Sequence, residues 1–513
     1  MSDPVLNAPA HELAVMVVGA GIMGAGIAQV AAQAGHPVWL HDSRPGAAED
    51  ACRKLAATFE ALVAKGKLTA DAASAASARL RPARGLADAA EAALVVEAIV
   101  ERLDAKQALL GELEAIVTPQ CVLASNTSSI SITALARGLK QPGRVVGMHF
   151  FNPVPLMKLV EVISGLQTAP AVAEAVQALA TRWGKTAVRA RSTPGFIVNR
   201  IARPFYAESL ALLQEQAATP AQLDACLRGA GFRMGPCELM DLIGHDTNFA
   251  VTESVYRANF DDRRFTPSLV QLELVDGGLL GRKSGQGFYD YRQGAPGAAV
   301  DLPVTASMAP EPQHVVLHGA GAWIDGWAET LRAQGCAVTM DTCSGWMGLS
   351  RGNAQLRLST GRCAGDIAAR EGVRDVAVFD LPVRALQGQP SEGALAFAVN
   401  GAGQPAWAAE AAGWLRRLGF APVQVADVPS LVVARTLAML INEAGDAVQQ
   451  GVCTAEAADL AMKLGVNYPA GPFEWLQAWG VAPVTDVLES LDQHYRGERY
   501  RVSPLLRRAL WSQ

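Results

Sequence analysis

Residues 14–34 read AVMVVGAGIMGAGIAQVAAQA, and this stretch decides the fold. The run at 14–18 is rich in β-branched side chains, which favour a strand. Gly19, Gly21 and Gly24 follow as a Gly-x-Gly-x-x-Gly turn, and the residues to Ala34 suit a helix. A strand, a glycine turn and a helix in this order are typical of a dinucleotide-binding fold, with phosphate at the helix N-terminus.

A second strand-like run at 37–41 ends at Asp42, where such folds place a carboxylate for the ribose hydroxyls. A carboxylate there repels a 2′-phosphate and so favours NAD over NADP, although Arg44 leaves NADP open. The alternative is that Asp42 is a solvated turn residue or a helix cap. We predict that the cofactor is bound by Gly19, Gly21, Ile22, Met23, Gly24 and Asp42.

Composition excludes several classes of protein. With 513 residues, half of them hydrophobic, the chain is expected to form two to four globular domains. A net charge of −5 without a basic run makes nucleic acid an unexpected partner. Eight cysteines without a Cys-x-x-Cys pair, and a start without a signal-peptide pattern, favour a cytoplasmic protein with no membrane association. No set of side chains has metal-ligand spacing, so no metal is predicted.

Further strand-like segments at 93–100, 121–125 and 144–148 are separated by helix-length stretches. This alternation predicts an α/β fold with a doubly wound, Rossmann-type sheet. Ligands of such sheets bind beyond the carboxyl ends of the strands. The polar clusters at 125–129 (SNTSS) and 149–153 (HFFNP) each follow a strand directly and are therefore the candidate site.

Four motifs occur together and in order: SNTSS at 125–129, HFFNPVP at 149–155, KLVEV at 158–162 and PGFIVNR at 194–200. With them, residues 13–291 closely resemble the L-3-hydroxyacyl-CoA dehydrogenase family. The resemblance implies an NAD-dependent enzyme that converts an L-3-hydroxyacyl-CoA to the 3-ketoacyl-CoA, as in the β-oxidation of fatty acids or of aromatic-acid products.

The resemblance also implies roles for single residues. His149 is expected to be the general base, Glu161 to orient its ring, and Ser128 and Asn199 to bind the substrate oxygen. Lys65 and Lys67, in a helical hairpin over 46–80, are expected to contact coenzyme A. Positions expected to line the cofactor are Glu101, Lys106, Ser128, Asn152 and Lys283.

Each of these residues also has an ordinary structural interpretation. A lone histidine such as His149 is most often a satisfied core or turn residue, and a charge in an alternating strand, such as Glu161, usually marks a solvent face. The SNTSS cluster is also compatible with a loop that caps a helix. Lysines on an exposed hairpin are usually only solvated.

The second half of the chain repeats the first in degraded form. The segment at 314–321 (HVVLHGAG) is again a strand and a glycine turn, and 337–341 again ends in an acid, Asp341. The segment at 427–435 matches 192–200 at a shift of 235 positions, but Ala434 replaces Asn199. No counterpart of the SNTSS or HFFNP cluster is evident in this half, which predicts that it is catalytically inactive.

We predict an all-α domain after each α/β domain. The expected segments are a dinucleotide-binding domain at 1–192, a helical domain at 193–292, a linker at 293–312, a degenerate Rossmann-like domain at 313–423 and a second helical domain at 424–513. The second helical domain is expected to pack on the first as an intramolecular stand-in for a partner subunit, and a homo-oligomer stays possible. Two other functions stay open: a dehydrogenase of a small 3-hydroxy acid without coenzyme A, and a non-catalytic dinucleotide-binding scaffold.

Overall fold

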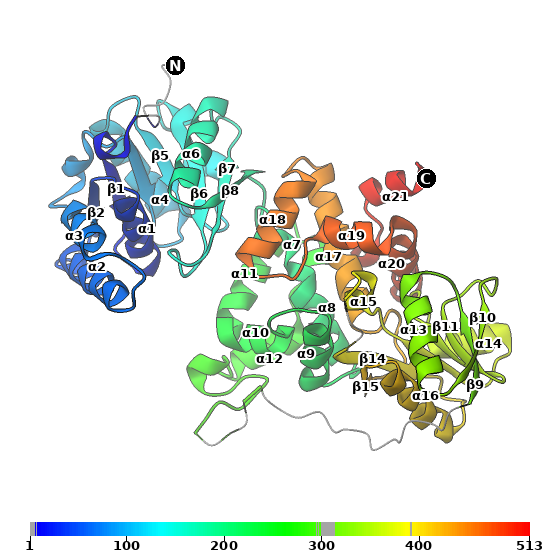
Figure 1. Cartoon of the computed structure of the whole chain (residues 1–513). Helices are drawn as coiled ribbons and strands as arrows, with labels where there is room; N and C mark the ends of the chain where they lie inside the picture. The colour runs from blue at the N-terminus through cyan, green and yellow to red at the C-terminus, as the bar shows by residue number, and fades with distance from the viewer. Residues whose placement is uncertain are drawn as a thin grey trace. The chain divides into compact units, whose positions relative to one another are not determined.

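The computed structural model describes residues 6, 8–293, 295, 297–298, 313–389 and 392–512. The chain folds into two compact units, Met1–Arg200 with Gln450–Val466, and Ile201–Gln449 with Asn467–Gln513. Each unit contains one β-sheet with helices packed on it (Figure 1). The predicted fold class, a Rossmann-type sheet and a helical part repeated in degenerate form, is confirmed. The predicted linker lies almost wholly outside the described residues, and the finer domain boundaries stay predictions.

The first unit is built on an eight-stranded sheet with the order β3-β2-β1-β4-β5-β6-β7-β8. Its neighbouring strands are parallel except β6 and β7, which are antiparallel. Every residue of β1 and β4 is buried because helices cover both faces of the sheet, which explains the uncharged sequence of β1. The strands are β1 (Val15–Val18), β2 (Val38–His41), β3 (Leu80–Pro82), β4 (Leu94–Glu97), β5 (Val122–Ser125), β6 (Val145–Phe150), β7 (Leu159–Ser164) and β8 (Thr186–Arg191).

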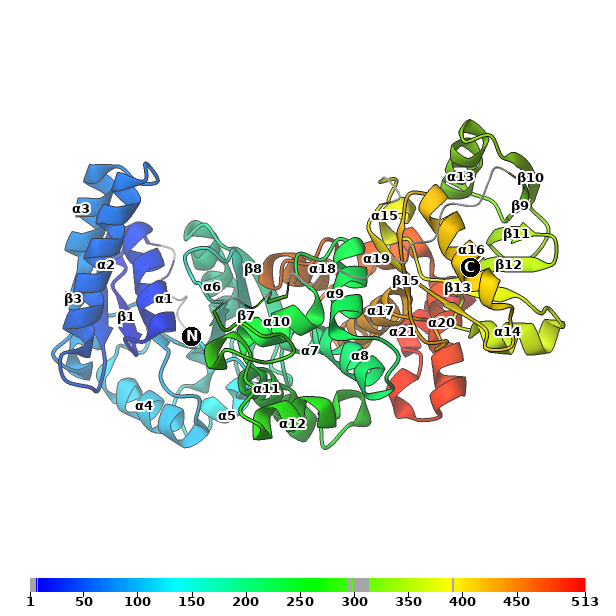
Figure 2. The same cartoon turned by 90° about the horizontal axis from the view of Figure 1, so that it is seen from below.

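Helices α1, α2, α3 and α6 share one hydrophobic core with the sheet, and Figure 2 shows α4 on the other side of the sheet from α1. The predicted hairpin over 46–80 is formed by α2 and α3, and α3 begins at a capping Thr69. The helices of the first 200 residues are α1 (Ile22–Gln33), α2 (Ala47–Ala64), α3 (Ala70–Arg79), α4 (Leu103–Ile116), α5 (Ile132–Leu135), α6 (Pro170–Arg182) and α7 (Val198–Ile201). Helix α18 (Ala455–Gly465) also belongs to this unit and contacts β7 and β8.

The second unit contains a seven-stranded mixed sheet with the order β10-β9-β11-β12-β13-β14-β15. Here β11 is antiparallel to both of its neighbours and follows β10 closely, so the described chain has no helical hairpin at the place of α2 and α3. This sheet is therefore a reduced version of the first. Its strands are β9 (His314–His318), β10 (Ala337–Asp341), β11 (Gly348–Arg351), β12 (Ala354–Leu358), β13 (Val376–Phe379), β14 (Ala394–Val399) and β15 (Ala421–Gln424).

The helices of the second unit come from both halves of the sequence. From the first half they are α8 (Arg203–Gln214), α9 (Pro220–Gly229), α10 (Pro236–Ile243), α11 (His245–Ala258) and α12 (Leu269–Asp276). From the second half they are α13 (Ala322–Ala333), α14 (Ala364–Glu371), α15 (Val383–Leu386), α16 (Pro405–Arg417), α17 (Val433–Gln449), α19 (Pro472–Trp479), α20 (Val481–Tyr495) and α21 (Pro504–Trp511).

Helices α8 and α17 contact each other around a buried ion pair. The Nε of Arg435 lies 2.6 Å from Oε2 of Glu208, and both side chains are fully buried. Arg499 binds the other oxygen of Glu208 at 2.7 Å. Burial opposes the charge of Glu208, yet the guanidinium groups of Arg499 and Arg435 hold its pKa below the ordinary value. The two helical segments are therefore joined by a paired, hydrogen-bonded charge network.

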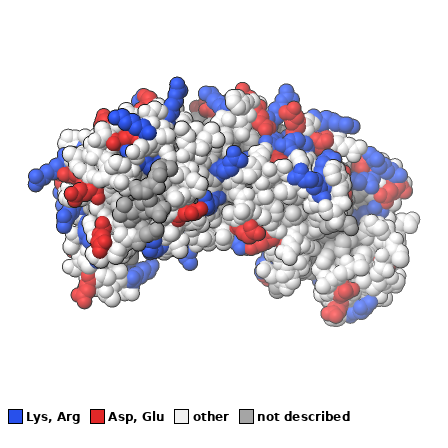
Figure 3. All heavy atoms as spheres, turned by 90° about the horizontal axis from the view of Figure 1, so that it is seen from above, with Lys and Arg blue, Asp and Glu red and all other residues white. Residues whose placement is uncertain are grey.

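The surface carries both signs of charge. On the face drawn in Figure 3, basic and acidic side chains are interspersed, as expected for 44 basic and 49 acidic residues. No helix among the described residues has both the length and the apolar character that a bilayer-spanning segment requires.

Candidate active site

The glycine turn after β1 has the close approaches that a dinucleotide-binding turn requires. Gly19 has φ of +110°, and a Cβ there would lie 2.4 Å from the carbonyl oxygen of Ala98. A Cβ on Gly24 would lie 1.7 Å from the oxygen of Gly19, so α1 packs tightly on the turn. A Cβ on Gly21 would meet no atom within 4 Å. The open space at Gly21 is where the backbone can receive a pyrophosphate.

Asp42 lies directly after β2, next to this turn. Its Oδ2 accepts a hydrogen bond from the backbone N–H of Ala20 at 2.8 Å. Arg44 donates to both carboxylate oxygens, from Nε at 2.9 Å and from its terminal nitrogen at 3.0 Å. These bonds from Arg44 hold the pKa of Asp42 well below its usual range. A charged carboxylate therefore stands beside the turn, and Arg44 is engaged by it.

A cleft of about 770 Å³ opens between the turn, Asp42 and α4. This volume is in the range of small-molecule sites and suits the adenosine part of a dinucleotide. The lining residues include Val18, Gly19, Gly21, Asp42, Ile99 and Leu109. The residues of the turn and the cleft therefore fit the predicted cofactor, and their individual roles stay predictions.

His149 and Glu161 form a buried pair near the end of the sheet. They lie opposite each other in the antiparallel register of β6 and β7, with Nδ1 of His149 2.6 Å from Oε2 of Glu161. The exposed fraction is 7% for the His149 side chain and 0% for that of Glu161. The alternative in which Glu161 marks a solvent face is therefore wrong, because the sheet is covered at β7.

The second oxygen of Glu161 is occupied by backbone donors. Oε1 accepts hydrogen bonds from the N–H groups of Ile197 and Val198, each at 3.0 Å, where α7 begins. The carboxylate is thus fixed at one end by the chain and at the other by the imidazole. Two rings, those of Phe151 and Phe196, lie 4.5 and 5.9 Å from the imidazole, measured between ring centres.

The structure brings Ser128, Asn199 and Glu101 together. Oε1 of Glu101 accepts from the backbone N–H of Ser128 at 2.9 Å, and Nδ2 of Asn199 donates to the Ser128 carbonyl at 3.4 Å. Burial opposes the charge of Glu101, but Lys106 and the hydrogen bonds from Thr127 and Ser128 keep its pKa below the ordinary value. Glu101 therefore holds the SNTSS loop in place.

The side chain of Lys106 is more deeply buried than we expect for a residue that lines an open cofactor cleft. Its side chain is 1% exposed and its Nζ lies 2.5 Å from Oε1 of Glu97, whose other oxygen accepts from Ser125 Oγ at 2.6 Å. Sequence reasoning missed Glu97, whereas Ser125 belongs to the SNTSS cluster. The available signal was a charged residue at the end of the otherwise apolar β4. In this structure Lys106 acts through Glu97 and Glu101, which it contacts.

The other predicted residues are exposed or belong to the second unit. Lys65 and Lys67 are exposed at the tip between α2 and α3, and Asn152 is exposed after β6. Lys283 belongs to the second unit, where it pairs with Asp246. Their predicted contacts with coenzyme A or the cofactor stay predictions.

Lys185 is a buried residue of this region that sequence reasoning missed. Its ammonium group donates to the carbonyls of Val154 at 2.5 Å and Met157 at 2.8 Å, in the loop that follows β6. Burial lowers its pKa to about 8. No sequence motif identifies it, because a lysine before a strand is ordinarily solvated.

The second sheet contains a strand equivalent to the one that carries HFFNP, although the HFFNP residues themselves are absent from it. Strands β13 and β14 are antiparallel like β6 and β7, and the backbone N–H of Asp380 pairs with Ala396 as His149 pairs with Glu161. Asp380 is fully buried and accepts from the N–H groups of Val432, Val433 and Ala434 at 2.6–2.9 Å. The place of the base thus holds a carboxylate.

Comparison with family models assigns the parts of the chain. Residues 14–193 match the 3-hydroxyacyl-CoA dehydrogenase NAD binding domain. The 3-hydroxyacyl-CoA dehydrogenase C-terminal domain matches twice, at 195–291 and 431–512, and residues 356–429 match the 3-hydroxybutyryl-CoA dehydrogenase reduced Rossmann-fold domain. Across the described residues no cluster of three or more His, Cys, Asp or Glu side chains is arranged as a metal site.

Individual relatives agree with this assignment. A 3-hydroxyadipyl-CoA dehydrogenase of Escherichia coli is 43% identical over 96% of both chains. The crystal structure of a 3-hydroxybutyryl-CoA dehydrogenase from Escherichia coli K12 covers 97% of this chain and 98% of its own, with 42% identity and a TM-score of 0.86. The (S)-3-hydroxybutyryl-CoA dehydrogenase from Ralstonia eutropha matches 55% of this chain and 99% of its own, with 40% identity and a TM-score of 0.53.

Proposed function

This chain belongs to the 3-hydroxyacyl-CoA dehydrogenase family, and we propose that His149, held by Glu161, is the base that lets it oxidise an L-3-hydroxyacyl-CoA to the 3-ketoacyl-CoA with NAD. In this reaction the hydroxyl proton goes to His149 as the C3 hydrogen leaves with its electron pair. NAD, when bound, supplies the acceptor for that hydride. The products are the 3-keto thioester, NADH and one proton.

The observation that carries the proposal is the bond between Nδ1 of His149 and Oε2 of Glu161. Because Glu161 is an acceptor, the network assigns the ring proton to Nδ1 and leaves the lone pair of Nε2 to receive a proton. The same carboxylate stabilises the imidazolium that forms. The two backbone donors on Oε1 prevent Glu161 from turning away, so the ring keeps one orientation.

Two further side chains steady the reacting oxygen in this proposal. Ser128 presents its hydroxyl on the loop that Glu101 holds, and Asn199 is linked to the same loop. A hydroxyl and an amide at fixed positions stabilise the charge that develops on the substrate oxygen. The cofactor is placed by the open backbone at Gly21 and by Asp42, whose carboxylate suits the ribose of NAD.

For the substrate, we propose a short acyl-CoA. The printed names of the relatives include 3-hydroxybutyryl-CoA and the dicarboxylic 3-hydroxyadipyl-CoA, and both stay admissible for this chain. Lys65 and Lys67, exposed on the hairpin of α2 and α3, are proposed to meet the coenzyme A phosphates.

We also propose that residues 424–513 replace a partner subunit for residues 193–291. The Arg435–Glu208 pair and the contact between α8 and α17 support this idea. A cytoplasmic location is supported by the eight cysteines, all of which are free. A fragment ending near Tyr291 tests the first idea by chromatography, because a well-behaved monomer would contradict it.

The proposed reaction is tested with purified protein, NAD and a panel of 3-hydroxyacyl-CoA substrates, by following the absorbance of NADH. Turnover of 3-hydroxybutyryl-CoA or 3-hydroxyadipyl-CoA is the expected result. Turnover of the free 3-hydroxy acids alone would indicate the dehydrogenase without coenzyme A. NAD binding without turnover of any substrate would indicate a scaffold.

A further inference from the structure

A segment of the degenerate half packs against the strand that carries Glu161. Residues 450–466 belong to the first unit, and the carbonyl of Val452 accepts a hydrogen bond from the backbone N–H of Arg191 at 2.8 Å, at the end of β8. Oε1 of Gln450 accepts from Arg200 at 2.8 Å, next to Asn199. The turn before α18 is therefore bonded to the chain just before the PGFIVNR motif and to the last residue of that motif.

Gly465, the last residue of α18, is in direct contact with the surroundings of Glu161. A Cβ at this position would lie 2.7 Å from Cδ2 of Leu159 and 3.0 Å from Cγ2 of Val198. Leu159 is two residues from Glu161 in β7, and the N–H of Val198 binds Glu161. The absence of a side chain at Gly465 thus sets how closely α18 approaches β7 and Val198, a residue whose N–H binds the carboxylate.

Cys453 gives an independent indication of this proximity. Burial, followed by the negative charge of Glu161, raises the pKa of the Cys453 thiol to about 12. The Cys453 side chain, in the turn before α18, therefore lies within the electrostatic field of Glu161.

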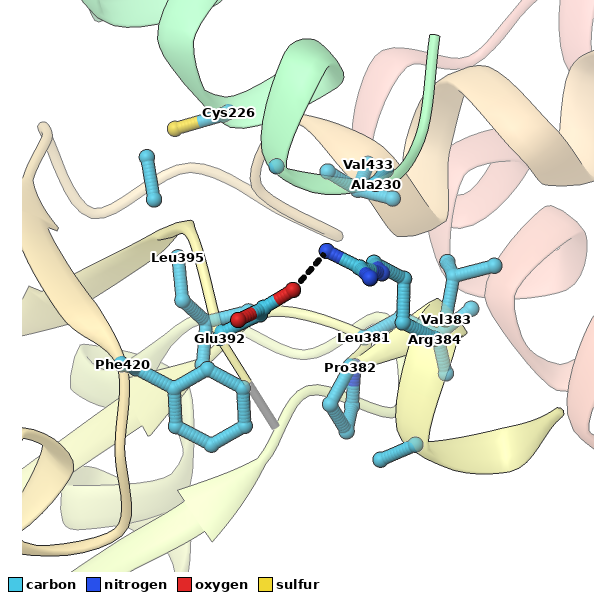
Figure 4. A pocket seen from close by; sticks show the side chains of 13 residues that line it. Cys226, Ala230, Leu381, Pro382, Val383, Arg384, Glu392, Leu395, Phe420 and Val433 are labelled. Carbon is cyan, nitrogen blue, oxygen red and sulfur yellow. Dashed lines mark ion pairs between the residues drawn. The ribbon is translucent and has the colours of Figure 1, made fainter. Parts of the chain in front are cut away.

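The same packing occurs on the other sheet with the halves exchanged. Gly229, the last residue of α9, lies against Ala394 at the start of β14, where a Cβ would be 2.3 Å from the Ala394 oxygen. Figure 4 shows the surroundings of this contact, with Cys226 and Ala230 on one side and Leu395 on the other, and with an ion pair between Arg384 and Glu392. Each nucleotide-type sheet is thus braced by a helix from the other half of the sequence.

We propose that α18 and its preceding turn are positioning elements for the His149–Glu161 pair, and that Gly465 sets the place of β7. This inference rests on the proposed function, because it concerns the geometry of the proposed base. It gives the degenerate half a role in the reaction without any catalytic residue of its own.

The test compares Gly465→Ala with Gly229→Ala in the full-length protein, by kcat, the KM for NAD and thermal unfolding. Gly465→Ala is expected to lower kcat about tenfold with an unchanged KM for NAD, because a small displacement of a catalytic group is costly. Gly229→Ala meets backbone atoms and is expected to lower the unfolding temperature more, with kcat unchanged. An unchanged kcat in Gly465→Ala, or an equal loss in both variants, would overturn the proposal.

A double-mutant cycle with Glu161→Gln separates positioning from general loosening. Once the carboxylate is removed, Gly465→Ala is expected to cause no further loss of kcat, whereas an independent tenfold loss contradicts the proposal. If Gly465→Ala does not fold, Gln450→Leu replaces it with the same expectations. Full turnover in Glu161→Gln alone would show instead that the proposed function of the pair is wrong.

Discussion

The two sheets of this molecule place different side chains at one equivalent position. In the first, His149 faces Glu161 across β6 and β7, and Glu161 binds the N–H groups where α7 begins. In the second, Asp380 stands in the place of the histidine and binds the N–H groups at the start of α17 itself, opposite Ala396. A carboxylate at the helix N-terminus is present in both sheets, but only the first has an imidazole beside it.

This difference separates a structural task from a catalytic one. The first N–H groups of a helix have no partner within the helix, and burying them without an acceptor is costly. In the first sheet one carboxylate both satisfies these groups and holds the imidazole that we propose as the base. In the second sheet the shorter carboxylate of Asp380, on the neighbouring strand, satisfies these groups, and no imidazole accompanies it.

Removing the imidazole should give the largest effect. His149→Ala is expected to lower turnover about 10²–10⁴-fold, the usual contribution of a general base. Affinity for NAD should change little, because the ring does not line the adenosine cleft. Steady-state kinetics and NAD titration measure both quantities, and unchanged turnover would refute the assignment of the base.

Removing the second carboxylate should affect stability alone. Asp380→Ala leaves three backbone N–H groups of α17 buried without their acceptor, so a loss of about 2–4 kcal/mol in the free energy of unfolding is expected. Turnover per folded molecule should stay at the wild-type value, as denaturant melts and kinetics can show together. A large fall in turnover would indicate that the second sheet takes part in the chemistry.

The pH dependence of stability sharpens the same comparison. Burial raises the pKa of Asp380 to about 6, although hydrogen bonds from Val433 and Ala434 oppose the shift. A raised pKa means that the folded state favours the protonated form of Asp380. The contribution of this protonated carboxyl to the free energy of unfolding is therefore fully present below about pH 4 and is lost as pH rises through about 6. Relative to Asp380→Asn, the wild type should therefore lose up to about 3 kcal/mol between pH 4 and pH 7. An unchanged difference between the two proteins over this range would contradict the shift.

The two strand-end acids provide the smallest expected effect. Asp42→Asn should weaken NAD binding about tenfold, because the amide is a weaker acceptor for the ribose hydroxyls. Asp341, its counterpart after the second glycine turn, interacts with His318 and the N–H of Cys343 instead. Asp341→Asn is the matched control and should leave NAD binding unchanged in calorimetry. Equal effects would mean that both turns bind the cofactor.

The sequence predicts the parts of this molecule that depend on local pattern. The strand and glycine turn at 14–24, the hairpin of α2 and α3 and the position of two polar clusters at strand ends follow from short motifs in order. The Rossmann-type sheets and the repeat of the helical part are confirmed on this basis. Such features are predictable because hydrophobic periodicity, glycine spacing and the order of short motifs are set by residues that lie close together in the sequence.

Other features depend on partners that are distant in the sequence. The burial of Glu161 depends on the cover that the chain places over β7, and Lys106 is enclosed because Glu97 ends a neighbouring strand. Asp380 was missed because its strand shares register with β6 but not its motif. The contact of Gly465 with Leu159 joins two halves whose sequences show no signal of it.

That last contact also constrains how the chain can fold during synthesis. The strand β7 leaves the ribosome long before α18, and at roughly 5–20 residues per second the delay is tens of seconds. During this interval Leu159 lacks the packing contact that α18 provides. A premature stop before α18 would therefore leave a polypeptide with every proposed catalytic residue and no completed surface around them.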